Sequence, residues 1–92
     1  MAEAGKVRAY GITVTPNPLS GGKAQVRFAL PQAGPLTLSV FDIAGRTVEH
    51  QTVLAGRTGS ATLDLRGLSA GVYLVKLESG TFTDSRKLVV ND

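Results

Sequence analysis

The sequence has no cysteine and no tryptophan, a single histidine, and seven acidic residues in 92 positions. Without cysteine, neither a disulfide framework nor a thiolate metal site can form. The lone histidine, His50, cannot build a histidine metal cluster. These absences exclude the disulfide-rich class of small domains and the common zinc sites.

Long hydrophobic runs are also missing. No apolar run approaches the ~20 residues of a membrane-spanning helix, so we expect no membrane insertion. The first residues, 1–6, lack the apolar core of a signal peptide, so if the domain is exported its signal is expected elsewhere. Ninety-two residues make one domain, and we interpret residues 1–8 as a linker remnant and 9–92 as the folded domain.

Basic residues outnumber acidic ones by ten to seven, which gives a net charge of +3. They are scattered, and only Arg86 and Lys87 are adjacent. A nucleic-acid-binding surface usually clusters basic residues and places aromatic residues among them. The pattern therefore predicts an ordinary solvated surface and no nucleic-acid partner.

Short segments of alternating apolar and polar residues, separated by turn signals, fill the chain, and no helical stretch is present. This pattern predicts an all-β fold, a seven-stranded antiparallel β-sandwich of immunoglobulin or fibronectin type. The expected strands are 10–15, 24–30, 36–41, 47–54, 60–65, 68–78 and 82–90. The expected core residues are Val26, Phe28, Leu38, Val40, Leu63, Leu65, Tyr73, Val75 and Leu77.

The densest apolar segment is Leu68–Glu78, which we predict to be a central strand. Its start is apolar on both faces, as in a strand covered on both sides. Ser79-Gly80 predicts a tight turn into the last strand, 82–90. We expect the outer edge of that last strand to be almost uncovered, and therefore open to pairing with a partner.

The sequence contains no catalytic constellation. No Gly-x-Ser-x-Gly signature is present, and His50 is interpreted as an exposed strand residue. Asp42 and Asp64 lie at turns, where they could cap the backbone or contribute to a calcium site. Turn capping is the ordinary role, so we predict a non-catalytic domain without cofactor or metal.

Five motifs follow one another along the chain: Val14-Thr15-Pro16-Asn17-Pro18, Leu30-Pro31, Val40-Phe41-Asp42-x-x-Gly45-Arg46, Leu68-x-x-Gly71-Val72-Tyr73-Leu74-Val75-Lys76-Leu77 and Arg86-Lys87-Leu88-Val89-Val90. In this order they resemble the C-terminal sorting domain of the type IX secretion system. The chain is similar also to the immunoglobulin-like domain of flagellar hook-capping proteins.

The resemblance implies a sorting signal that directs an attached N-terminal cargo across the outer membrane to the cell surface or beyond. Implied partners are a secretion translocon or shuttle and a sortase-like protease, which would cleave near residues 1–8. The residues implied in partner recognition are Gly71, Val72, Tyr73, Lys76, Arg86, Lys87, Leu88, Val89 and Val90.

The alternative is a structural, carbohydrate-binding or protein-binding accessory module of an exported protein. Carbohydrate modules usually present exposed aromatic residues. Both tyrosines here, Tyr10 and Tyr73, lie in expected strands, where packing into the core is their ordinary role.

Overall fold

The computed structural model describes residues 10–20 and 22–91. These residues form seven strands that account for most of the described chain, so the all-β prediction is confirmed. None of the described residues forms a helix long and apolar enough to cross a membrane. The strands are β2 (Gly11–Thr15), β3 (Lys23–Ala29), β4 (Gly34–Phe41), β5 (Thr47–Ala55), β6 (Thr58–Asp64), β7 (Gly71–Ser79) and β8 (Phe82–Val90).

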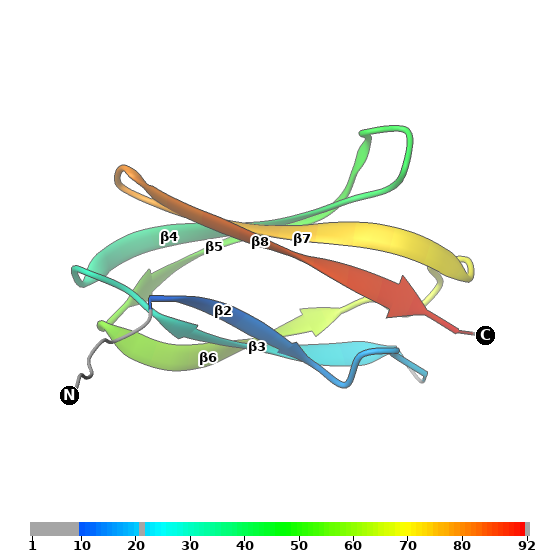
Figure 1. Cartoon of the computed structure of the whole chain (residues 1–92), viewed down its shortest axis with the longest axis horizontal. Helices are drawn as coiled ribbons and strands as arrows, with labels where there is room; N and C mark the ends of the chain where they lie inside the picture. Colours follow the sequence, from blue (N-terminus) through cyan, green and yellow to red (C-terminus); the bar gives the residue numbers. More distant parts are fainter. Residues whose placement is uncertain (1–9, 21, 92) are drawn as a thin grey trace, which may run out of the picture.

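The strands form two antiparallel sheets that pack face to face (Figure 1). One sheet has three strands in the order β2-β3-β6, and the other has four in the order β5-β4-β7-β8. The predicted central strand is β7, which pairs with β4 on one side and with β8 on the other. The polar strand β5 lies at an edge, as its composition predicts.

The core is built by the inward-facing residues of both sheets. In β3 and β7 buried and exposed residues alternate, because successive side chains of a strand point to opposite faces. All nine predicted core residues are buried, and Leu38, Leu63 and Leu77 are fully enclosed. The core extends beyond the prediction through Ile12, Val14, Leu19, Ala24, Leu30, Leu36, Leu88 and Val90.

The outer edge of β8 is covered at its C-terminal part, around Lys87 and Val89, which contradicts the expectation of an almost uncovered edge. Asn17 donates from Nδ2 to the Lys87 carbonyl at 2.8 Å, and its Oδ1 accepts from the Val89 amide at 3.0 Å. Next to it, the Leu19 amide donates to the Val89 carbonyl at 2.7 Å. The expectation failed because it considered only chain beyond Val90, whereas the covering segment comes from the N-terminal side.

The start of β8 is tied to the same N-terminal segment. Asp84 Oδ2 accepts from the Ile12 amide at 3.0 Å, which joins β8 of one sheet to β2 of the other. The Asn91 amide donates to the Leu19 carbonyl at 2.8 Å beyond the end of β8. The N-terminal segment therefore holds β8 near its start, at Asp84, and at its end.

Two further expectations require correction. Val72 and Leu74, at the start of β7, are 44% and 42% exposed, so no described segment covers the outer face of this strand. Tyr10 is 48% exposed and meets Phe82 edge-on at a ring separation of 6.3 Å, outside the core. The predicted linker, residues 1–8, lies outside the described residues.

Candidate functional site

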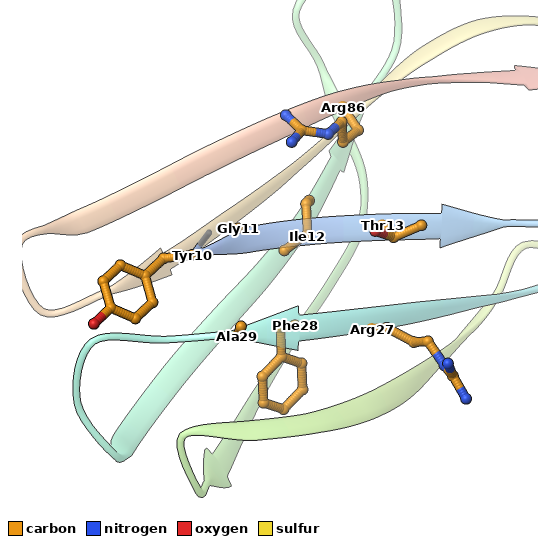
Figure 2. Close-up of a pocket in the computed structure, with 8 residues that line it drawn as sticks. All are labelled: Tyr10, Gly11, Ile12, Thr13, Arg27, Phe28, Ala29 and Arg86. Carbon is orange, nitrogen blue, oxygen red and sulfur yellow. The ribbon is translucent and has the colours of Figure 1, made fainter. Parts of the chain in front are cut away.

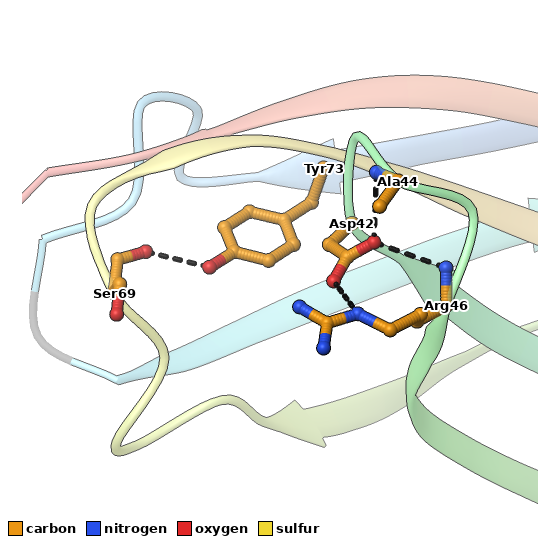
Figure 3. A network of polar contacts seen from close by, with 5 residues as sticks. All are labelled: Asp42, Ala44, Arg46, Ser69 and Tyr73. Atoms are coloured by element: carbon orange, nitrogen blue, oxygen red, sulfur yellow. Dashed lines mark hydrogen bonds and ion pairs between the residues drawn. The ribbon is translucent and has the colours of Figure 1, made fainter.

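Within the β4–β5 turn, the Asp42 side chain of the Asp-x-x-Gly-Arg motif accepts hydrogen bonds from the turn itself (Figure 3). Asp42 Oδ1 accepts from the Ala44 amide at 2.9 Å and from the Arg46 amide at 3.0 Å, and Oδ2 accepts from Arg46 Nε at 2.9 Å. These donors, the Arg46 amide first, lower the pKa of Asp42. Gly45 adopts a φ of +85°, as the predicted bulged turn requires.

Asp64 is engaged in a similar way at the end of β6. Arg66 donates from Nε at 2.9 Å and from Nη2 at 2.6 Å to its carboxylate. The Arg66 guanidinium lowers the pKa of Asp64 to about 2. Within the described residues no group of three His, Cys, Asp or Glu side chains gathers to hold a metal ion. Asp42 and Asp64 thus act as turn caps in this structure.

Tyr73 stabilises the fold from inside the sandwich. Its ring is buried, and its hydroxyl donates to the Ser69 carbonyl at 2.7 Å, which holds the loop that enters β7 (Figure 3). Sandwiches of immunoglobulin type use the same arrangement, a tyrosine bonded to the backbone a few residues upstream. Tyr73 therefore faces the interior, where a partner of the folded domain cannot touch it.

The predicted recognition residues divide between the interior and the surface. Tyr73, Leu88 and Val90 face the core, and Gly71 begins β7 opposite Val90. Arg86 is exposed, but its Nη1 pairs with Asp84 at 3.0 Å. The structure brings four of the predicted residues together on the outer face of the β7–β8 hairpin: Val72, Lys76, Lys87 and Val89.

Lys87 is the available cation of this face. It is exposed on β8 directly opposite Leu74 of β7, and it forms no ion pair with any described residue. Lys76, by contrast, lies 3.8 Å from Glu78. Lys87 is therefore the charge on this hairpin that a partner can meet without breaking an existing pair.

Three apolar residues and one polar residue near the β7–β8 hairpin were not among the residues predicted from the sequence. Leu74, Phe41 and Ile43 were not proposed as contacts, although apolar residues at outward strand positions and in a turn are a visible signal. Asn17 gave no signal, because its partners are 70 and 72 residues away in the sequence.

A groove beside β2 is a further surface feature with charged residues (Figure 2). It has a volume of about 290 Å³ and is lined by Tyr10, Gly11, Ile12, Thr13, Arg27, Phe28, Ala29 and Arg86. Its lining includes no carboxylate and no histidine, so it offers no acid–base pair. Arg27 and Arg86 lie on opposite sides of β2 in Figure 2 and do not converge on one ligand.

Comparison with a solved structure defines the fold class. The chain superimposes on part of latent PorU from Porphyromonas gingivalis, a crystal structure of a dimer, with a TM-score of 0.65 and 18% sequence identity. The match covers 86% of this chain and 9% of PorU, so the chain spans a small part of that protein. At this identity the likeness shows a shared sandwich fold.

A family model then gives the identification. The model of the secretion system C-terminal sorting domain matches residues 13–91, nearly the whole chain, and the chain belongs to this family. No curated protein matches the chain.

Membership assigns a role that the earlier resemblance implied. The domain is a sorting signal of the type IX secretion system, which exports attached cargo across the outer membrane to the cell surface or extracellular space. Membership in the family implies interaction with the secretion machinery and a cargo attached on the N-terminal side. Domains of this family are generally non-catalytic. The family match favours the sorting signal over the alternative, a structural or binding accessory module of an exported protein.

Proposed function

We propose that the secretion machinery reads this signal on the folded domain, at the outer face of the β7–β8 hairpin, with Lys87 as the central contact. One observation carries the proposal. Along the last motif, Leu88 and Val90 face the core while Lys87 and Val89 face outward. The fold buries Leu88 and Val90, so a partner of the folded domain can meet Lys87 and Val89 without contact with the other two.

Occupation of the C-terminal part of the β8 edge supports recognition through the outer face of the hairpin. A partner that adds a strand needs free backbone groups along an edge. Asn17 and Leu19 already bond the Lys87 carbonyl and both backbone groups of Val89. The side chains on the outer face remain accessible when this edge is occupied.

The position of the cargo leaves that face free. Cargo would join the chain before Tyr10, whose ring contacts Phe82 near the β7–β8 turn. Lys87 lies five residues further along β8 than Phe82, and β2 starts at the end of the sandwich opposite to the end of β8 (Figure 1). A sortase-like protease would act on the segment before Tyr10.

We also propose that the domain has no catalytic activity and needs no metal. The carboxylates of Asp42 and Asp64 are engaged by arginine and backbone donors. The groove beside β2 holds no acid–base pair. Thermal melting with and without EDTA should give the same midpoint.

A charge reversal tests the recognition site. The experiment fuses a fluorescent cargo to the chain in a bacterium that has the type IX system, and measures fluorescence at the cell surface. Lys87→Glu should lower surface cargo about tenfold, while Lys87→Arg should retain it. Surface charge changes usually alter stability by less than ~0.5 kcal/mol, so the purified variants should melt like the parent.

The matched control is Lys23→Glu, which reverses an exposed lysine on β3 of the other sheet. It should export like the parent, because it changes net charge by the same amount at a different face. Equal export of Lys87→Glu and the parent would refute the proposed contact.

A further inference from the structure

Exposed apolar residues gather at one end of the four-stranded sheet. Ile43 is 87% exposed, and Val72 and Leu74 are 44% and 42% exposed. Leu74 pairs with Phe41 of β4, and Val72 pairs with Val89 of β8. Phe41 and Val89 are partly exposed and are not among the residues that pack against the core. We name these five residues, Phe41, Ile43, Val72, Leu74 and Val89, the outer patch.

The outer patch is exposed on the outer face of the four-stranded sheet, and the β4–β5 turn projects beyond this face. The three-stranded sheet packs against the opposite face of β4 and β7, and no described segment crosses the outer face (Figure 1). The β4–β5 turn, which includes Ile43, rises beyond this face at the same end of the molecule (Figure 1). The turn therefore forms a raised border along one side of the outer patch.

Toward the other end, the same face carries a row of polar residues. The outward positions in this row are Thr52, Thr37, Glu78 and Thr83, which are direct neighbours in the register. Beyond the row, Leu54 opposite Pro35 is a single large exposed apolar side chain. A sheet with one solvated face normally carries polar residues along all of it. The change from polar to apolar within one face marks an interaction surface, because contiguous exposed apolar area is uncommon on monomers without a partner.

Among the described residues, the charge beside the outer patch that forms no ion pair is basic. It is Lys87, opposite Leu74, whereas Lys76, two residues after Leu74 on the same face, already lies near Glu78. The acidic groups near this face are engaged: Asp42 with Arg46, and Glu78 with Lys76. An occupant that complements the patch must therefore be apolar at its centre and carry carboxylates at its rim.

We propose that the outer patch docks a protein surface of the secretion machinery that is apolar at its centre and acidic at its rim. This proposal rests on the proposed function and extends the contact from Lys87 to β4, β7 and the β4–β5 turn. Leu74 and Ile43 supply the buried apolar contact, and Lys87 supplies the charge pair that fixes orientation.

A second copy of this chain complements the patch less well. A two-fold axis through the outer patch would bring the two Lys87 side chains toward each other, and the net charge of +3 opposes self-association. An anionic membrane is also less suitable. Membrane-recognition clusters carry roughly four to eight basic residues, whereas two lysines lie on the outer face of this hairpin.

The test uses the same cargo fusion and surface-fluorescence assay. Ile43→Ser and Leu74→Ser should each lower surface cargo about fivefold or more, as loss of a central apolar contact does. The matched control is Leu54→Ser. Leu54 is 84% exposed on the same sheet, opposite Pro35 at the other end of β4 and β5, and its variant should export like the parent. All three purified variants should keep the parent's melting midpoint within a few degrees, because the replaced side chains are exposed.

The outcomes separate the two proposals. Normal export of Ile43→Ser and Leu74→Ser, with export lost in Lys87→Glu, would overturn the docking patch and leave the Lys87 contact standing. Normal export of all three variants would overturn both. Light scattering that shows a dimer broken by Leu74→Ser, or flotation with anionic vesicles that Leu74→Ser abolishes, would replace the protein partner with a second copy or a membrane.

Discussion

Asn17 should hold the N-terminal segment on the edge of β8, and its replacement by alanine tests this role. The side chain donates to the Lys87 carbonyl at 2.8 Å and accepts from the Val89 amide at 3.0 Å, so it acts on this edge as a neighbouring peptide group would. Asn17→Ala removes both bonds and leaves the two backbone groups to water.

The expected cost follows from the two bonds and their exposure. A hydrogen bond contributes about 0.5–1.5 kcal/mol net, and water can replace part of this loss at an exposed site. Asn17→Ala should therefore cost about 1–2 kcal/mol of unfolding free energy. For a domain of this size, that lowers the melting midpoint by roughly 5–15 °C.

Thermal melting followed by circular dichroism measures the midpoint, and hydrogen exchange of the Val89 amide reports the bond itself. Asn91→Ala is the matched control, since it lies at the same edge and keeps its backbone bond to the Leu19 carbonyl. Asn91→Ala should melt within a few degrees of the parent. Equal midpoints for the two variants, with unchanged exchange at Val89, would refute the role of Asn17.

Three other changes test the fold and its charges. Tyr73→Phe should lower the unfolding free energy by about 1 kcal/mol, because it removes only the hydrogen bond to the Ser69 carbonyl. Tyr73→Ala should lower it by about 3–5 kcal/mol, because it also leaves a cavity in the core. Chemical denaturation of the two variants and the parent measures both values. Gly45→Ala should cost about 1–2 kcal/mol, because its φ of +85° places Cβ against the backbone, and the melting midpoint should fall accordingly. The pKa of Asp64 is lower in the folded chain, so the unfolded chain binds more protons in acid. Stability should fall as pH drops from about 4 toward 2, and Asp64→Asn should flatten that part of a melting-versus-pH curve.

The fold was predictable because each strand carries its own pattern. Alternation in β3, for example, assigns Val26 and Phe28 to the core without knowledge of the rest of the chain. The turn at Asp42–Arg46 was predictable for the same reason, since all its bonds lie within five residues. Local signals therefore determined the strands, the turns and most of the core.

The candidate site was less predictable because it depends on long-range neighbours. Leu19 reads as a loop residue, yet it is buried and bonds to Val89 and Asn91. Leu74 reads as an apolar residue of a doubly covered strand, and only the sheet order shows that its outer face is open. The burial of Leu19 and the exposure of Leu74 both depend on contacts between segments distant in the chain, which the sequence pattern does not specify.

The most direct test of the account asks whether the folded domain carries the export signal. It compares surface fluorescence of the cargo fused to the intact chain with that of the same fusion lacking residues 86–92. The deletion removes Leu88 and Val90 from the core together with Lys87 and Val89 from the outer face. The account predicts efficient surface display of the intact fusion and loss of display after the deletion. Equal display of the two fusions would contradict the claim that this domain sorts its cargo as a folded signal.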